Sequence, residues 1–286
     1  SEVRKQHEFT TKYRVHDSNY MEVDGHFVAE TSEVVVSSST FSFDDFLYTR
    51  SLGFIFFAIG HPGFYKLFFR GLEGVGVDTF VFLSNFLSPS SDYTWPKGYL
   101  DFLSDLNTAF RSELYDSVDA VKESMKKDYL RDGRQVRSGT KINNLFTSRL
   151  MFIEQYWHNE VLTKHLEILG ITPAKHDEWL AVKDLMAISA KERLNPRYPH
   201  NPGKLTVQHD ILSWISENFC IPLQQYALSQ PIDLSFIMPD HTMSRLSSFN
   251  KTNGHLSDTN YYYNALTALQ PQKITRCPFS YETVTV

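Results

Sequence analysis

Apolar and polar positions alternate through the first part of the chain, and this alternation predicts β structure there. The segments KYRV and HFVAETSEVVV lie on either side of Asp24-Gly25, a dipeptide that favours a tight hairpin turn. Val34–Val36 form a β-branched run that is typical of a strand. We therefore expect a small β-hairpin over residues 12–36, which would be only marginally stable alone because two strands bury little surface.

A helix is predicted to follow this strand after a short junction. Ser42 is a favourable N-cap residue, and Asp45 stands three residues further on, as in a capping box. Phe41 and Phe46 are spaced to close a hydrophobic staple across the same junction. The first helix is expected to run from Ser42 to about Gly60, a residue suited to end a helix.

The helical period dominates the rest of the chain. Further helices are predicted from Pro62, over VDTFVFLSNFL, over residues 100–130, over 140–169 and 173–193, and in HDILSWISENF, MSRLSSFN and TNYYYNALTAL. IDLSFIMP alternates like a strand, and KITRCPF is a candidate second strand. The expected fold class is mainly α: a bundle-like helical domain with a small N-terminal β-hairpin and a small C-terminal α/β element.

A loop rich in proline is the best candidate for a domain boundary. Residues 195–204, NPRYPHNPGK, contain three prolines and two asparagines. We therefore predict an N-terminal hairpin region over residues 1–41, a helical domain over 42–194 and a small α/β subdomain over 205–286.

Composition limits the classes of partner. The chain has 286 residues, 42% hydrophobic and 21% charged, as in a globular protein with a core of its own. The formal net charge of −5 argues against a broad basic surface for nucleic acid. Residues 51–60, SLGFIFFAIG, are about half as long as a spanning helix, so no membrane span is expected. The chain opens on Ser1 with no signal-peptide pattern, and we expect a processed product or a piece of a longer protein.

Motifs for catalysis and cofactor binding are missing from the sequence. The two cysteines, Cys220 and Cys277, cannot form a disulfide framework or an iron–sulfur site by themselves, although one bridge between them stays open. They favour a reducing, cytoplasmic setting. There is no Walker motif, no GxGxxG after a strand, no GxSxG and no HExxH. Catalytic residues stay unknown, and no cofactor-binding residue or metal ligand is predicted.

One constellation stands out on the helix predicted over residues 140–169. On a helical wheel, Glu154, His158 and His165 share a face with apolar residues, namely Leu150, Met151, Val161, Leu162, Ile168 and Leu169. Glu154 and His158 are four residues apart and should be neighbours, and His165 lies two turns further on. The opposite face carries polar residues, as a solvated face should: Arg149, Asn159, Glu160, Lys164 and Glu167.

Three interpretations of this stripe stay open. Burying a carboxylate and two imidazoles is costly unless they have partners, so a hydrogen-bonded network in which Glu154 bridges to His158 is the structural interpretation. A pocket wall that faces a substrate is the functional one, with Glu154, His158 and His165 as its candidates. A metal site needs three or more ligands, and only one helix supplies evident ones.

Three segments of the chain resemble one protein family. TKYRV at 11–15, EVVVSSSTFSFDDFLYTR at 33–50 and HDILSWI at 209–215 are similar in order and spacing to the region that follows the catalytic barrel in cobalamin-binding radical S-adenosylmethionine proteins. The residues that match or nearly match are Ser38, Ser42, Asp44, Asp45, Phe46, Asp210, Ile211 and Trp214.

This resemblance implies a C-terminal, substrate-facing region whose chemistry lies in an upstream barrel, on the same polypeptide or a partner chain. In the family, a CxxxCxxC loop binds a [4Fe–4S] cluster and S-adenosylmethionine, and a DxHxxG signature places a histidine beneath cobalamin. Neither motif occurs here, so these cofactors would belong to the absent domains. Residues 1–41 would pack near the rim of that barrel. The phenylalanine-rich segments SLGFIFFAIG and LFFRGL are expected to form core helices rather than a cofactor site, and if exposed they would be the face that docks on the absent domain.

Two functions follow for the chain. It is part of an enzyme for methyl transfer or another radical modification of an unreactive carbon, with no cofactor of its own. Alternatively, it is a free-standing helical binding or scaffold module without catalysis. The substrate, the reaction and the oligomeric state are not specified by the sequence.

Overall fold

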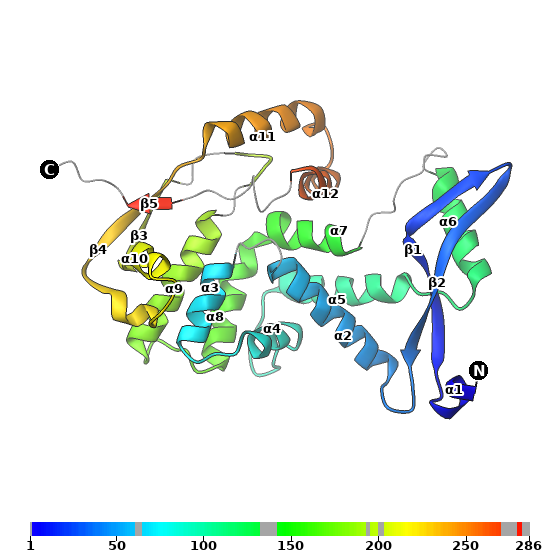
Figure 1. Ribbon diagram of the computed structural model, residues 1–286, viewed down its shortest axis with the longest axis horizontal. Coiled ribbons are helices and arrows are strands. Elements are labelled where there is room, and N and C mark those ends of the chain that lie inside the picture. Colours follow the sequence, from blue (N-terminus) through cyan, green and yellow to red (C-terminus); the bar gives the residue numbers. More distant parts are fainter. Residues whose placement is uncertain are drawn as a thin grey trace. The chain divides into compact units, whose positions relative to one another are not determined.

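The computed structural model describes residues 2–60, 65–131, 142–192, 195–199, 203–269 and 279–281. It confirms the expected fold class, with mostly helices, a two-stranded N-terminal hairpin and a small antiparallel sheet near the C-terminus (Figure 1). The chain forms two compact units, which we describe separately: unit 1 is Ser1–Phe54 with Leu100–Phe146, and unit 2 is Ile55–Tyr99 with Thr147–Val286. The domain boundaries expected near residue 41 and at 195–204 stay predictions.

Unit 1 combines the hairpin with helices. Its elements, of which α2, α5 and α7 also contribute residues to unit 2, are α1 (Glu2–Gln6), β1 (Thr10–Val23), β2 (His26–Ser37), α2 (Phe43–Ile55), α5 (Lys97–Ser112), α6 (Val118–Arg131) and α7 (Ile142–Ser148). Asp24 and Gly25, between the strands, have φ angles of 49° and 77°. Positive φ at both positions is what a two-residue type I′ turn requires, so the hairpin turn predicted from this dipeptide is confirmed.

The hairpin is covered on one face by α6. Phe27 of β2 lies against Tyr129 of α6, with ring centroids 5.6 Å apart, and the helix runs beside both strands (Figure 1). Beside β1, Tyr13 and Tyr115 exchange two main-chain hydrogen bonds of 2.8 and 2.7 Å. Among the described residues, no strand pairs with the outer edge of β2. A partner strand for that edge stays a prediction.

The junction between β2 and α2 is the expected capping box. The Ser42 main-chain N–H donates to Asp45 Oδ2 at 2.8 Å, and the Asp45 N–H donates to Ser42 Oγ at 3.1 Å. The Ser42 hydroxyl also donates to Asp45 Oδ2, at 2.7 Å. The main-chain N–H and the hydroxyl of Ser42 together hold the pKa of Asp45 below its usual range, because both stabilise the carboxylate. At the other end of α2, Phe54 is buried among aromatic rings at 6.2 to 6.4 Å, those of Phe102, Phe110 and Phe146.

Unit 2 is built from the remaining elements. They are η1 (Phe56–Gly60), α3 (Lys66–Gly74), α4 (Thr79–Leu87), η2 (Arg149–Ile153), η3 (Gln155–Trp157), α8 (His158–Ile168), α9 (His176–Glu192), β3 (Gly203–His209), α10 (Ile211–Ser216), η4 (Leu223–Tyr226), β4 (Ala227–Phe236), α11 (Asp240–Asn253), α12 (Asp258–Ala268) and β5 (Phe279–Tyr281). Helix α3 packs closely on α9 at Gly71, where there is no room for a larger residue. A Cβ atom at this position would lie 2.2 Å from Leu185 Cδ1. Within the described ranges, no helix has both the length and the apolar character needed to cross a bilayer.

A three-stranded antiparallel sheet lies in the C-terminal part of unit 2, in the order β3-β4-β5. Strand β4 confirms the strand predicted from IDLSFIMP, and β5 includes Phe279, the last residue of KITRCPF. The other residues of that segment lie outside the described ones. Strand β3 was not expected, because the proline-rich run before it and the helical segment after it leave only a short alternating stretch. Its inward residues are Leu205, Val207 and His209.

Candidate functional site

The helix predicted over residues 140–169 is interrupted in the structure. Helix α7 is followed by the π turn η2 and the 3₁₀ turn η3, and α8 begins only at His158. Glu154, between the two turns, has φ −106° and ψ 31°, which is not helical geometry. The prediction of one continuous helix is therefore wrong, and Glu154 is out of helical register with His158.

Glu154 is paired with Arg149. Arg149 Nε donates to Glu154 Oε1 at 2.6 Å, and the two side chains are 21% and 14% exposed. The main-chain N–H of Glu154 also donates to the carbonyl of Arg149, at 2.9 Å, a bond across five residues that draws the two side chains together. Among the described residues, Glu154 makes no hydrogen bond to His158. The expected bridge from Glu154 to His158 is therefore wrong. The expected solvated position of Arg149 is also wrong, because its side chain is largely buried against Glu154.

His158 is buried and bonded to a tyrosine from a distant part of the chain. Its Nδ1 lies 3.0 Å from the hydroxyl of Tyr65, the residue that precedes α3. Both side chains are about 5% exposed or less. The inward orientation expected for His158 is confirmed, and its partner is a phenol rather than a carboxylate.

His165 is fully buried beside a second tyrosine. The Tyr99 hydroxyl donates to the main-chain carbonyl of Phe86, and His165 Nε2 lies 3.3 Å from the same hydroxyl oxygen. A hydroxyl has one hydrogen, so His165 must donate from Nε2 to Tyr99. This fixes the tautomer and leaves Nδ1 as an acceptor, to which no hydrogen bond is made among the described residues. Trp95 covers the imidazole, with ring centroids 4.7 Å apart.

Burial sets the charge state of this second pair. Desolvation lowers the pKa of His165 from its ordinary value of 6.5 to about 4, because the imidazolium ion cannot be hydrated there. Desolvation also raises the pKa of the Tyr99 hydroxyl. Both groups are therefore neutral near pH 7, and they serve as hydrogen-bonding groups there.

A small cavity lies beside His158. It has a volume of about 10 Å³, room for one water molecule or a methyl group. Apolar side chains from α3, α4 and α8 line it together with Tyr65 and His158, and both π turns contribute, η1 through Ile59 and η2 through Leu150 and Met151. π turns are rare and occur often at functional sites, so the presence of two of them at one cavity makes this cavity a candidate functional site.

The arrangement fits a structural network best. His158 and His165 each have a tyrosine partner, and Glu154 has an arginine. Within the described part of the chain, no group of three or more His, Cys, Asp or Glu residues could hold a metal ion. A role for Glu154, His158 and His165 in a substrate pocket stays a prediction.

A buried carboxylate–imidazole pair was not found by sequence reasoning. Asp184 Oδ2 on α9 lies 2.8 Å from His209 Nδ1 at the end of β3, and it also accepts the Gln208 main-chain N–H at 2.7 Å. His209 is 2% exposed. The pair ties β3 to α9. No periodicity signals it, because its members are 25 positions apart and lie on elements of different type.

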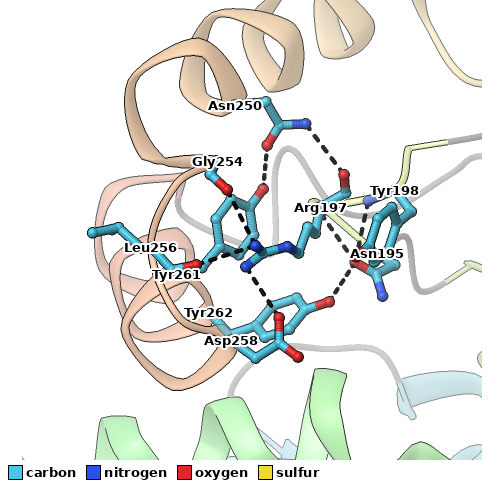
Figure 2. A network of polar contacts seen from close by, with 9 residues as sticks. All are labelled: Asn195, Arg197, Tyr198, Asn250, Gly254, Leu256, Asp258, Tyr261 and Tyr262. Carbon is cyan, nitrogen blue, oxygen red and sulfur yellow. Dashed lines mark hydrogen bonds and ion pairs between the residues drawn. The ribbon is translucent and has the colours of Figure 1, made fainter.

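Arg197, in the proline-rich loop, is the centre of a polar network (Figure 2). Its guanidinium group donates to the carbonyl oxygens of Gly254 and Leu256, both at 3.1 Å, and forms an ion pair with Asp258 at 3.0 Å. It also lies 4.8 Å from the centre of the Tyr261 ring. These partners all belong to the turn between α11 and α12 or to the start of α12, so one side chain fastens that turn to the loop.

Other members of this network fix the loop itself. The Asn250 amide donates to the carbonyls of Pro196 and Arg197 at 3.2 and 3.4 Å. Asn250 also accepts from the Tyr261 hydroxyl, and Figure 2 shows this bond together with the one to the Arg197 carbonyl. The Tyr262 hydroxyl donates to Asn195 at 2.9 Å. Neither the arginine nor these amides formed a recognisable motif, since most of these partners are more than fifty positions away, although Tyr261 is 11 positions from Asn250.

An exposed apolar patch lies on η1 and α4. Phe56 and Phe57 are each 37% exposed, Phe80 is 55% exposed and Val81 is 44% exposed. The rings of Phe56 and Phe80 are in contact, with centroids 5.8 Å apart. We call these four residues the phenylalanine patch. The patch includes Phe56 and Phe57 of SLGFIFFAIG, the segment that we expected to be a docking face if it were exposed.

No protein-family model matches the chain, and no curated protein matches it.

Proposed function

We propose that the chain is the C-terminal, substrate-facing region of a cobalamin-dependent radical S-adenosylmethionine enzyme. Such enzymes carry out methyl transfer or another radical modification of an unreactive carbon. The observation that carries the proposal is the junction at residues 33–50, where the segment most similar to the family forms a strand, a capping box and a helix in direct succession.

The third resembling segment supports the same proposal. Asp210 starts α10 by accepting the Ser213 main-chain N–H at 2.9 Å. Ile211 and Trp214 are buried, and the Trp214 indole N–H donates to the carbonyl of Ile221 at 3.0 Å. Asp210 is thus a helix cap, and Ile211 and Trp214 are buried positions of the helix that follows it.

The phenylalanine patch would dock on the absent barrel. Apolar side chains that lie together and stay exposed to water are typical of interaction surfaces. The open edge of β2 would lie near the rim of that barrel.

The family's cofactors would be held by the upstream region. A [4Fe–4S] cluster needs three or four thiolates, and this chain has two cysteines, so its donor set does not fit the cluster. The oxygen sensitivity of such clusters suits the reducing, cytoplasmic setting that the cysteine usage favours.

A second candidate is a helical binding or scaffold module without catalysis. The pairing of His158 with Tyr65 and of His165 with Tyr99 favours it, because buried side chains that are hydrogen-bonded to each other serve packing as well as they would serve a substrate.

The coding sequence upstream of Ser1 separates the two candidates. If it continues in frame and encodes CxxxCxxC, the longer polypeptide should take up about four irons per chain and bind cobalamin after anaerobic reconstitution. Visible spectroscopy and the consumption of S-adenosylmethionine measure both. A start codon directly before Ser1, or a longer polypeptide that binds neither group, would refute the enzyme proposal.

The docking role of the phenylalanine patch has its own test. Binding of this chain to the separately expressed upstream region is measured for Phe80→Glu and for Tyr156→Glu, a matched control on an aromatic residue that is 75% exposed outside the patch. A loss of affinity of about tenfold or more is expected for Phe80→Glu alone. Equal affinity of both variants would refute the docking role.

A further inference from the structure

Helix α11 is attached to the rest of unit 2 by little apolar surface. Of its 14 residues, only Thr242 and Leu246 are buried. Helix α12 buries Tyr261, Tyr262 and Ala265, and both of these tyrosines also belong to the polar network of Figure 2. Segments with few buried apolar contacts open at lower free energy than the core does.

Polar contacts supply much of the remaining attachment. The Arg197 guanidinium donates to two carbonyl oxygens in the turn between α11 and α12 and forms an ion pair with Asp258, the first residue of α12. Asn250 adds bonds from α11 to the same loop. These contacts converge on a single loop, and losing the Arg197 side chain would remove those that hold Gly254, Leu256 and Asp258 to it.

The surface beneath α12 belongs to the π turn η2. The ring of Tyr262 stacks on that of Phe152, with centroids 5.5 Å apart and an angle of 15° between the planes. Phe152 is 4% exposed. Its neighbours Leu150 and Met151 form one wall of the cavity beside His158. Removing α12 would therefore uncover η2 and one wall of that cavity.

We propose that α11 and α12 form a hinged cover over η2 that opens as one unit while the rest of unit 2 stays folded, with Arg197 as its latch. Opening exposes Phe152 and gives access to the cavity beside His158. The proposal does not rest on the enzyme assignment, since it concerns the motion of this chain alone.

Native-state amide hydrogen exchange on the full chain tests the cover. We expect the amides of α11 and α12 to exchange together and at least tenfold faster than those of α8 and α9. Arg197→Lys keeps the charge but loses the fork that reaches two carbonyls and Asp258, so it should speed exchange in α11 and α12 by a further tenfold and leave α9 unchanged. Arg245→Lys, at an exposed position of α11, is the matched control and should change nothing.

Thiol labelling measures access to η2 directly. In a Cys220→Ser, Cys277→Ser background, the side chain introduced by Met151→Cys is buried when the cover is closed, since Met151 is 0% exposed. Arg197→Lys should raise its labelling rate by the same factor as it raises exchange in α12. If Arg197→Lys does not fold, Asp258→Asn is the alternative variant, because it removes only the ion pair between Arg197 and Asp258. The Asp258 side chain is 65% exposed, so this change should not prevent folding, and it should also raise the labelling rate.

Two results would overturn the proposal. One is exchange of α11 and α12 at the rate of α8 and α9, which would mean that they unfold only with the whole unit. The other is equal acceleration of every helix by Arg197→Lys, which would make Arg197 a general stabiliser rather than a latch.

Discussion

Replacing Tyr99 with phenylalanine removes one hydroxyl group and leaves two buried partners unbonded. The hydroxyl donates to the Phe86 carbonyl and accepts from His165 Nε2 at 3.3 Å. Tyr99 and His165 are both 0% exposed, so water cannot replace the lost bonds. A buried polar group without a partner costs about 1–3 kcal/mol. Tyr99→Phe should therefore lower the free energy of unfolding by about 2–4 kcal/mol, a large share of the stability of an ordinary domain.

Urea denaturation at pH 7, followed by tryptophan fluorescence, measures this cost. Trp95 and Trp157 report on the site, because their rings lie 5.4 Å from that of Tyr99. Tyr156→Phe is the matched control, since it removes a hydroxyl at a position that is 75% exposed and should change stability by no more than about 0.5 kcal/mol. In a His165→Leu background, the cost of Tyr99→Phe should fall by about 1 kcal/mol, because one unbonded partner is gone. Equal stability of Tyr99→Phe and Tyr156→Phe would refute the reasoning.

Three further predictions concern stability. Lowering the pH from 6.5 to 4 should reduce the free energy of unfolding by roughly 3 kcal/mol through His165. The cause is that His165 takes up a proton at the ordinary pKa of 6.5 in the unfolded chain but only near pH 4 in the native protein. Urea titrations at several pH values measure this loss, and His165→Gln should not show it. Gly71→Ala should destabilise by about 1–2 kcal/mol through overpacking against Leu185, whereas Gly53→Ala, with open space around it, should be neutral or stabilising in thermal melts. Ser42→Ala should cost about 1 kcal/mol in the same melts, and an unchanged melting temperature would contradict its capping role.

Features whose physical cause is local were predicted from the sequence. The turn at Asp24-Gly25 needs two positive φ angles, and both residues adopt them readily. The cap at Ser42 depends on a side chain that reaches only three positions along the chain. Such short-range contacts are encoded by neighbouring residues, so the pattern that specifies them can be read directly.

Features that depend on distant partners were missed. Tyr65 is 93 positions from His158, and Tyr99 is 66 positions from His165. Arg197 bonds to carbonyl oxygens, which every residue has, so its partners leave no mark in the sequence. The burial of His158 and His165 was predictable from their face of the helix, but the identity of their partners was not.

The interrupted helix explains why the predicted stripe was only partly right. A helical wheel assumes a constant rotation per residue, and that assumption ends at η2, where the hydrogen-bond spacing changes from four residues to five. His158 and His165 both lie in the regular helix α8, so their shared orientation survives. Glu154 precedes the regular helix and turns toward Arg149 instead. The stripe is therefore three separate pairs, His158 with Tyr65, His165 with Tyr99 and Glu154 with Arg149. Only the first lies at the cavity, so a substrate that entered there would meet His158 and Tyr65 rather than three residues acting together.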